Sequence, residues 1–301
     1  MQKITPFLWF DSNAEEAVHF YTSHFKNSSI GKITRYDKAG AAASGRPEGS
    51  VMTASFKLSG QDFTAINGGS HFKFNPSISF FVVFETEAEI VNLWEKFNAG
   101  GMVLMELGKY DWSESYGWIQ DKFGLSWQIS LGPKSDLGQW ITPALLFVGK
   151  QHGQAEEAVR FYMSVFKNSS LEGILRYQAG DDEPAGTVKH AQFKLNDQVF
   201  MAMDSSFDHK FQFNEAISFV VNCDSQKEVD YYWAKLREGG DENAQQCGWL
   251  KDKFGVSWQI VPSVLFTFLQ DKDPAKSQRV MQAMLQMKKI EIAGLQKAYE
   301  K

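Results

Sequence analysis

The sequence predicts an α+β fold made of two copies of one domain, and three observations lead to this prediction. Ordered segments occur twice, such as Ala-Glu-Glu-Ala-Val at 14–18 and 155–159 and Ser-Trp-Gln-Ile at 126–129 and 257–260. The repeat distance is about 140 residues, which is the size of a domain and too long for a solenoid unit. In each copy a segment with helical periodicity precedes three strand-like runs, and this order then recurs. Each copy is therefore predicted to hold two βαβββ modules, and the chain four.

The first module of each copy opens with a short apolar run that ends at a helix signal. In the first copy Ser12 or Asn13 can cap the helix, and apolar residues recur from Ala14 at i, i+3, i+4, i+7 and i+11. The second copy repeats this spacing from Ala155. The Gly/Ala-rich stretch 39–49 lies between strands, and no helix is expected after it. The expected strands of these modules are 30–37, 49–58 and 61–67 in the first copy, and 171–178, 186–195 and 198–204 in the second.

The second module of the first copy follows the same plan. It comprises strand 77–84, helix 87–99 and strands near 102–110, 115–121 and 125–131. Residues 133–140 are the expected linker, because Pro and Gly punctuate them. From Asp273 the tail is predicted to be one helix with Pro274 near its first turn, packing on the domains or on a second subunit. The predicted domains are 1–132 and 141–263, followed by the C-terminal helix 273–301.

Composition and charge limit the classes of partner. The formal net charge is −5 at pH 7 with mixed signs along the chain, so no basic surface for nucleic acid or an anionic membrane is expected. No apolar stretch approaches the roughly 18 residues of a membrane span, and no basic leader opens the chain. A cytoplasmic location is therefore expected. Cys223 and Cys247 both lie in the second copy, which suits reduced thiols better than a disulfide framework.

Long motifs in both copies resemble a known family. They include Ile-Thr-Pro-Phe-Leu-Trp-Phe at 4–10, Ala-Glu-Glu-Ala-Val-X-Phe-Tyr, and Gly-Trp-X-X-Asp-Lys-Phe-Gly-X-Ser-Trp-Gln-Ile. These segments resemble the PhnB-like family, also labelled 3-demethylubiquinone-9 3-methyltransferase, of the vicinal oxygen chelate superfamily with glyoxalase I and bleomycin-resistance proteins. The resemblance implies that two βαβββ modules form a cupped mixed sheet around a cavity, with helices on the convex side. It also implies a monomer with an intramolecular pseudo-dimer, or alternatively a homodimer.

The superfamily's enzymes hold one divalent metal with His, Gln or Glu from several strands, which is a testable expectation here. Most of the implied positions carry poor ligands, so no metal site and no cofactor are predicted, and a divalent metal is kept as the alternative. The family label also suggests methyltransferase activity, but the sequence lacks the Gly-rich turn between a strand and a helix that commonly binds the cofactor of such enzymes. The implied ligand positions are Pro6 and Pro143, Ser77 and Ala216, Gln128 and Gln259, and 65–67 and 202–204, where only Asp204 is a strong ligand.

Candidate site residues follow from strand phase and chemistry. His190 and Gln192 share a strand face opposite Ala191 and Phe193, so His190 is the candidate base near neutral pH; a histidine bonded to a neighbour is the alternative. The arginines could bind a carboxylate or phosphonate, or form surface ion pairs. Aromatic side chains could clamp a planar ligand, or simply pack. The candidate ligand-binding residues are Gln128, Gln259, Arg35, Arg176, Asn67, Tyr110, Trp112, Trp118, Trp249 and Gln192.

Three functional hypotheses remain, and whether the chain is an enzyme stays open. The favoured one is a metal-independent protein that binds a small, partly aromatic or anionic molecule. The alternative is a lyase, isomerase or dioxygenase of the superfamily, using a metal or His190, with methyltransferase activity ranked below it. A scaffold whose tail mediates association is the third, and it predicts that truncation after Pro262 leaves ligand binding intact. Because segments 102–116 and 241–247 differ between the copies, the two cavities are expected to differ in shape.

Overall fold

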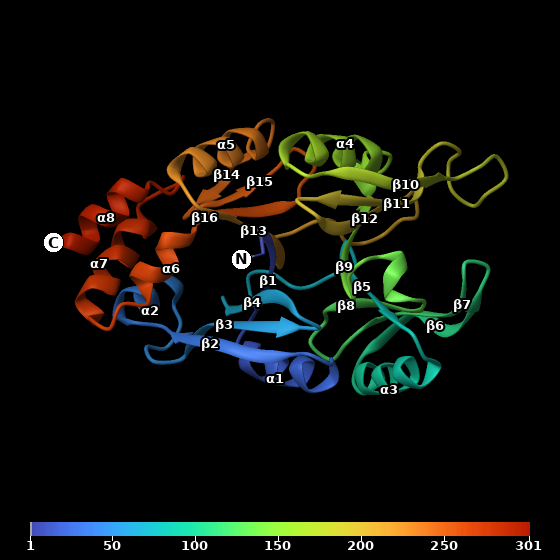
Figure 1. Cartoon of the computed structure of the whole chain (residues 1–301), viewed down its shortest axis with the longest axis horizontal. Coiled ribbons are helices and arrows are strands. Elements are labelled where there is room, and N and C mark those ends of the chain that lie inside the picture. Colours follow the sequence, from blue (N-terminus) through green and yellow to red (C-terminus); the bar gives the residue numbers. More distant parts are fainter. Residues whose placement is uncertain (1) are drawn as a thin grey trace. The chain divides into compact units, whose positions relative to one another are not determined.

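The computed structural model describes residues 2–301, apart from the side chain of Asp136, and the chain divides into two compact units (Figure 1). Unit 1 contains the residues up to Phe72 together with Asn214–Lys301, and unit 2 contains Lys73–Phe213. Each unit is built on one eight-stranded mixed sheet. The predicted α+β class, with four βαβββ modules in mixed sheets, is confirmed. No helix within residues 2–301 is both long and apolar enough to cross a membrane.

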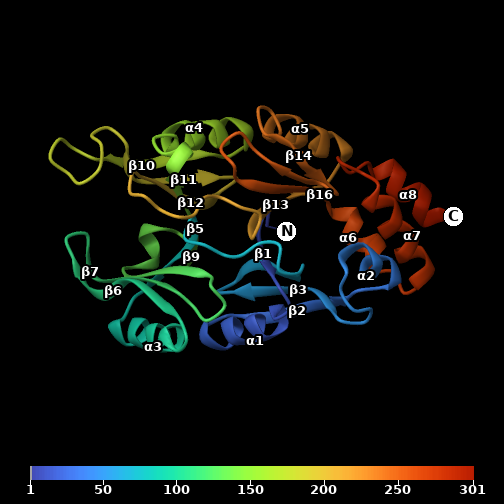
Figure 2. The same cartoon turned by 180° about the vertical axis from the view of Figure 1, so that it is seen from behind.

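Unit 1 has the strand order β14-β15-β16-β13-β1-β4-β3-β2. Helices α1 and α5 pack on this sheet, and α6, α7 and α8 gather beside α2 at one end of the unit (Figures 1 and 2). Its elements are β1 (Ile4–Phe10), α1 (Ala14–His24), β2 (Ser29–Arg35), α2 (Lys38–Ser44), β3 (Val51–Leu58), β4 (Gln61–Asn67), β13 (Ile217–Cys223), α5 (Gln226–Leu236), β14 (Asp241–Gln246), β15 (Trp249–Lys251), β16 (Ser257–Pro262), α6 (Ser263–Leu269), α7 (Pro274–Leu285) and α8 (Ile292–Glu300).

Unit 2 has the strand order β10-β11-β12-β9-β5-β8-β7-β6. Helix α3 packs on β7 and β8, and α4 packs on β11 and β12. Its elements are β5 (Ile78–Phe84), α3 (Glu87–Asn98), β6 (Met102–Tyr110), β7 (Ser113–Gln120), β8 (Ser126–Leu131), the 3₁₀ turn η1 (Lys134–Asp136), β9 (Ile141–Val148), the 3₁₀ turn η2 (Gly149–Gln151), α4 (Ala155–Val165), β10 (Ser170–Arg176), β11 (Val188–Leu195) and β12 (Gln198–Ser205).

Each sheet combines one module from each sequence repeat. In unit 1, β1 of the first copy pairs antiparallel with β13 of the second, with Thr5 opposite Val220 and Phe7 opposite Ser218. In unit 2, β5 of the first copy pairs in the same way with β9 of the second. The compact units therefore do not follow the ranges 1–132 and 141–263, which describe the repeat in the sequence. The physical reason is strand pairing, which joins the first module of one copy to the second module of the other.

The two tryptophans of the repeated Ser-Trp-Gln-Ile motif anchor the cores. Trp127 and Trp258 are 0% and 1% exposed. Each indole Nε1 donates a 2.8 Å hydrogen bond to a buried carboxylate, Asp121 for Trp127 and Asp252 for Trp258. The repeated Asp-Lys-Phe-Gly motif thus supplies the acceptor that a buried indole needs.

Two segments differ from the elements expected. The Gly/Ala-rich stretch contains helix α2, because the Asp37 side chain caps the Gly40 amide and Gly45 ends the helix in the left-handed conformation, at φ 69°. The C-terminal helix is present, but the tail beyond Asp273 forms two helices, α7 and α8. Between them, the carbonyls of Met287 and Lys288 accept hydrogen bonds from the β14–β15 turn. That pairing with the sheet interrupts the helix.

Gly68 is expected to resist substitution, because a Cβ atom there would overlap the Trp9 indole ring. The Trp9 Nε1 atom donates to the Gly69 carbonyl at 2.8 Å, which holds the ring in this position. We expect Gly68→Ala to lower the free energy of unfolding by about 1–3 kcal/mol through overpacking. Gly132→Ala is the matched control, since a Cβ atom there meets nothing within 4 Å. Equal thermal stability of the two variants would contradict this packing.

Candidate functional site

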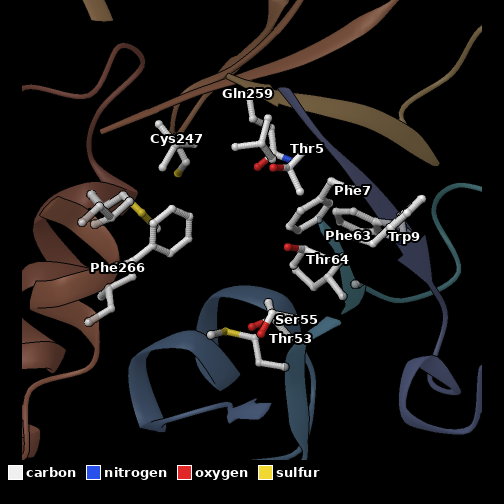
Figure 3. A pocket seen from close by; sticks show the side chains of 18 of the residues that line it. Thr5, Phe7, Trp9, Thr53, Ser55, Phe63, Thr64, Cys247, Gln259 and Phe266 are labelled. Carbon is white, nitrogen blue, oxygen red and sulfur yellow. The ribbon is translucent and has the colours of Figure 1, made fainter. Parts of the chain in front are cut away.

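A cavity of about 910 Å³ lies within unit 1. Its lining comes from the central strands β1, β3, β4, β13 and β16 and from the helices α2, α6 and α7. Figure 3 shows Thr5 and Gln259 on one side, Thr53 and Ser55 on another, and Phe266 across the opening between them. We call the face of the sheet that carries Thr5, Thr53, Ser55 and Gln259 the cavity face.

Amides and hydroxyls make up the polar part of the cavity face. Asn222 donates through Nδ2 to Thr5 Oγ1 at 3.1 Å and to the Gln2 carbonyl at 2.8 Å. Gln259 donates through Nε2 to Ser218 Oγ at 2.9 Å. Gln259 is only 6% exposed, yet within residues 2–301 its Oε1 atom accepts no hydrogen bond. Buried amide oxygens normally have a donor, so this atom is an open acceptor in the cavity.

Aromatic and aliphatic side chains form the walls. The Trp249 ring lies edge to face against Phe7, with centroids 5.7 Å apart, and against Trp9 at 6.1 Å. The tail helices add Leu265 and Phe266, along with methionines from α7. A mainly apolar wall with a few converging polar groups is the usual construction of a small-molecule site.

The lining contains one lysine and one aspartate, whose charges are opposite. Lys57 and Asp62 form an ion pair with each other. Burial raises the pKa of the Cys247 thiol, so this side chain stays protonated at neutral pH. Burial also raises the pKa of Tyr36, whose hydroxyl donates to the Asn67 carbonyl at 2.7 Å. The cavity therefore presents no unbalanced charge from these groups and no thiolate nucleophile.

The residues on the cavity face do not fit the superfamily's divalent metal. Thr5 and Phe7 line the cavity, so Pro6 between them points to the helix-covered face; the ligand position inferred from the sequence was wrong by one residue. Thr64 and Gln259 line the cavity and carry a hydroxyl and an amide, which are weaker ligands than carboxylate or imidazole. The lining also holds His71 and Asp62, and the Asp62 carboxylate is paired with Lys57. Among residues 2–301, no group of three or more His, Cys, Asp or Glu side chains is arranged to hold a metal.

Asp204 is the one strong metal ligand at the positions that the resemblance implies, and its carboxylate is already hydrogen-bonded to backbone N–H groups. Its carboxylate accepts hydrogen bonds from the backbone N–H groups of Gly153, Ala155 and Val188 at 2.8, 3.2 and 2.9 Å. Asn67 holds the same place in unit 1, where Oδ1 accepts from the Ala14 amide. Both side chains fasten the start of a helix to the sheet. Asn67 is therefore a structural residue in this fold.

In unit 2 the residue equivalent to Gln259 is hydrogen-bonded at both ends of its amide. The Tyr116 hydroxyl donates to Gln128 Oε1 at 2.7 Å, and Gln128 Nε2 donates to Ser79 Oγ at 2.8 Å. The Tyr116 ring lies edge to face against Tyr110 and Trp112, at 5.6 and 5.7 Å. Burial raises the pKa of the Tyr116 phenol, so it remains a hydrogen-bond donor.

His190 and Gln192 occupy the strand positions in unit 2 that Thr53 and Ser55 hold in unit 1, so they lie on the equivalent face of their sheet. Burial lowers the pKa of His190, which keeps its imidazole neutral at neutral pH. Among residues 2–301, His190 belongs to no group of three or more His, Cys, Asp or Glu side chains that could hold a metal.

The remaining candidates are not among the residues that line the unit 1 cavity. Arg35 Nη1 donates to the Gly49 carbonyl at 3.1 Å, and Arg176 pairs with Glu156 at 2.6 Å, which is the ion-pair alternative. The Trp118 indole donates to Ser126 Oγ at 2.8 Å. Tyr110 stacks on the exposed Trp112 at 5.0 Å. Of the ten candidate ligand-binding residues, only two line this cavity, Gln259 and Trp249.

Sequence reasoning missed several residues of the cavity. Thr5 and Thr64 escaped because the phase of β1 was set one residue off, although Thr64 lies opposite Phe7 in the parallel β1–β4 pair. Asn222 stands where the first copy has Val83, and this polar substitution in a buried strand was the available signal. The contribution of Leu265 and Phe266 from the tail had no counterpart in the first copy.

Comparison with known proteins identifies the family of this chain and structures with a similar fold. The 3-demethylubiquinone-9 3-methyltransferase family matches residues 2–130 and 139–261. The chain belongs to this family. A solved family structure, described as a putative 3-demethylubiquinone-9 3-methyltransferase, PhnB protein, from Bacillus cereus, is 45% identical and covers 44% of this chain and 100% of its own, with a TM-score of 0.41.

Across both repeats the fold is that of glyoxalase I. A structure of glyoxalase I from Zea mays is 11% identical, covers 87% of this chain and 92% of its own, and has a TM-score of 0.53. A mutant of the same enzyme is 11% identical over 88% of this chain and 96% of its own, with a TM-score of 0.56. These likenesses show the fold alone. The comparison with curated proteins gave no match.

The methyl-donor cofactor implied by the family's description does not fit the residues present. Such nucleotide-like cofactors commonly bind at a Gly-rich turn between a strand and a helix. The turn between β2 and α2 is Tyr36-Asp37, without glycine, and the Asp37 side chain is used to cap α2. In the cavity, Asp62 is engaged by Lys57. The β2–α2 turn beside the cavity is therefore not built to hold that cofactor.

Proposed function

We propose that the chain is a small-molecule-binding protein whose unit 1 cavity holds an uncharged, mainly apolar ligand without a metal. The observation that carries this proposal is the composition of the cavity, in which apolar walls surround a few amide and hydroxyl groups. Its volume of about 910 Å³ suits a drug-sized molecule. An anionic ligand is not favoured, because Arg35 lies outside the lining and Lys57 is neutralised by Asp62.

Blocking the cavity tests the proposal. Thr64 points into the cavity from β4, beside Phe7 and Phe63 (Figure 3). We expect Thr64→Trp to weaken binding of the neutral dye N-phenyl-1-naphthylamine at least tenfold, because the indole would fill space that the dye needs. Binding is measured by the rise in dye fluorescence on titration into the full-length protein.

The control for this titration is Arg35→Ala. The Arg35 side chain lies outside the cavity lining and donates to the Gly49 carbonyl, so its removal is expected to leave dye affinity unchanged. Undiminished dye binding by a folded Thr64→Trp variant would show that the dye binds elsewhere and would refute the proposal.

A metal-dependent enzyme of the superfamily is the alternative, and the position of His190 on the equivalent face of unit 2 favours it. A neutral imidazole there has the protonation state that a general base requires. Metal analysis after purification without chelator separates the two functions. We infer that no stoichiometric zinc, nickel, manganese or iron is retained, because no three His, Cys, Asp or Glu side chains among residues 2–301 are grouped to hold a metal. Stoichiometric metal would favour the enzyme.

We also propose that the chain acts as a monomer with an intramolecular pseudo-dimer. Support comes from the strand pairing, in which each sheet takes one module from each repeat. Light scattering should then give a mass near 34.1 kDa, and a mass twice as large would favour the homodimer.

A further inference from the structure

Two equivalent glutamines in the two units have different surroundings. Gln128 and Gln259 occupy the same place in the repeated Ser-Trp-Gln-Ile motif and each donates to an equivalent serine, Ser79 or Ser218. In unit 2 the Gln128 oxygen accepts from the Tyr116 phenol at 2.7 Å. In unit 1 the corresponding oxygen accepts nothing from the residues that the structure describes. The two units therefore differ by one phenolic donor.

One exchanged residue near the paired strands accounts for the difference. Trp118 lies opposite Gln128, and Trp249 lies opposite Gln259. Two positions earlier in the sequence, unit 2 has Tyr116 within β7, and unit 1 has Cys247 in the turn between β14 and β15, at φ 54°. A cysteine side chain is too short to reach the glutamine as the tyrosine does. Cys247 and Gln259 both line the unit 1 cavity (Figure 3), so a ligand in that cavity can approach the open amide oxygen.

We propose that the ligand of unit 1 is an uncharged phenol, whose hydroxyl donates to Gln259 Oε1 and whose ring occupies the place of the missing tyrosine. This inference rests on the proposed function, since it names the ligand class of the same cavity. The template is internal to the molecule, because unit 2 already shows a phenol seated on the equivalent amide.

The walls around this place suit an aromatic ring. In unit 2 the Tyr116 ring lies 6.3 Å from Phe81. At the position of Phe81 unit 1 has Val220, and at the position of Ser130 it has Val261, both of which line the cavity. Trp249 and Phe266 complete an apolar surround. Such a surround favours an aryl body and gives no compensation to a charged one.

The hydrogen bond also sets the protonation state of the ligand. An amide oxygen only accepts hydrogen bonds, so the phenol must keep its proton. Affinity for a simple phenol is expected to fall as the pH rises through its pKa of about 10. The phenolate would lack the donor and would place a negative charge beside Val220 and Val261.

Two probes of nearly equal shape test the inference with the full-length protein. The compound 2-naphthol carries the donor, and 2-methoxynaphthalene keeps the oxygen but lacks the proton. We expect 2-naphthol to bind roughly tenfold more tightly in calorimetric titrations near pH 7, as one neutral hydrogen bond predicts. Gln259→Met should abolish this preference, whereas Gln128→Met in unit 2 should leave it intact.

A second variant keeps the test decisive if Gln259→Met does not fold. Cys247→Tyr introduces the unit 2 tyrosine, whose own phenol should bond to Gln259 and weaken the binding of both probes at least tenfold. Equal affinity for the two probes in the unmodified protein would overturn the phenol inference while leaving a binding cavity. Binding of neither probe, together with no binding of N-phenyl-1-naphthylamine, would instead refute the proposed function. Undiminished 2-naphthol binding by a folded Cys247→Tyr variant would also overturn the inference.

Discussion

Replacing Asp252 by alanine is expected to lower the free energy of unfolding of unit 1 by about 3–5 kcal/mol. Asp252 is 2% exposed. Its Oδ1 atom accepts from the backbone N–H groups of Phe254 and Val256 at 2.9 and 3.0 Å, and Oδ2 accepts from Trp258 Nε1 at 2.8 Å. Alanine would leave three buried donors without an acceptor and a void beside the largest side chain of the core. Such losses are among the costliest single substitutions.

The measurement is thermal and urea unfolding followed by circular dichroism. Asp121→Ala removes the same carboxylate in unit 2, where it accepts from Phe123, Leu125 and Trp127. Both variants should unfold earlier than the parent, but only Asp252→Ala should also lose dye binding at the lower denaturant concentration, because the cavity lies in unit 1. Asp208→Ala, at an exposed ion pair with Lys210, should change stability by less than about 0.5 kcal/mol. A loss below about 1 kcal/mol for Asp252→Ala would mean that water replaces the carboxylate.

The motif around these aspartates shows how much of the fold the sequence could predict. Trp127 and Trp258 alternate with Gln128 and Gln259 along their strands, and both tryptophans are buried. Local periodicity of this kind depends only on the strand and its two faces. The same local rules predicted α3, where Thr86 caps the helix through its hydroxyl.

The pairing of modules could not be predicted in this way. The strands that β1 could join, β5 and β13, both begin with Ile-Ser-Phe, at 78–80 and 217–219. Their apolar patterns agree over the first five residues, 78–82 and 217–221, so local preference there is equal for both partners. The choice of β13 follows from long-range packing, which no segment of sequence expresses alone. The assignment of strand residues to the two sheet faces is also easily wrong, because an error of one residue in β1 put Pro6 on the cavity face in place of Thr5.

The site was only partly predictable for a related reason. The exchange of Tyr116 for Cys247 is visible in the sequence, but its effect on Gln259 depends on the register of β15 with β16. The arginines were singled out for their chemistry, and their actual partners, such as Glu156 for Arg176, come from neighbouring elements. Residue type suggests what a side chain can bind, and the fold decides what it meets.

The C-terminal tail separates the scaffold hypothesis, in which it only mediates association, from the proposed binding function, in which it forms part of the cavity wall. As a mere association element it could be removed without loss of ligand binding. In the structure Leu265 and Val280, together with Leu295 from α8, are buried in one cluster with Phe7 and Val261 of the sheet. Phe268 also stacks on Tyr299, with ring centroids 4.5 Å apart. The tail is therefore part of the core of unit 1.

Truncation after Pro262 is accordingly expected to abolish dye binding, because it removes the cavity wall formed by Leu265, Phe266 and Met284. It should also expose Phe7 and Val261 to water, with the loss of burial energy that this entails. Fluorescence titration and unfolding of the shortened chain measure the two effects. A folded shortened chain with full dye affinity would contradict the assignment of the wall to the tail.

A point substitution separates loss of the wall from loss of folding. Leu295 is 0% exposed and does not line the cavity. Leu295→Ala should therefore cost about 2–5 kcal/mol of unfolding free energy while leaving dye affinity unchanged in the fraction that remains folded. Phe266→Ala should do the reverse, since its side chain is 40% exposed and faces the cavity. Opposite effects on stability and affinity would show that one face of the tail holds the unit together and the other meets the ligand.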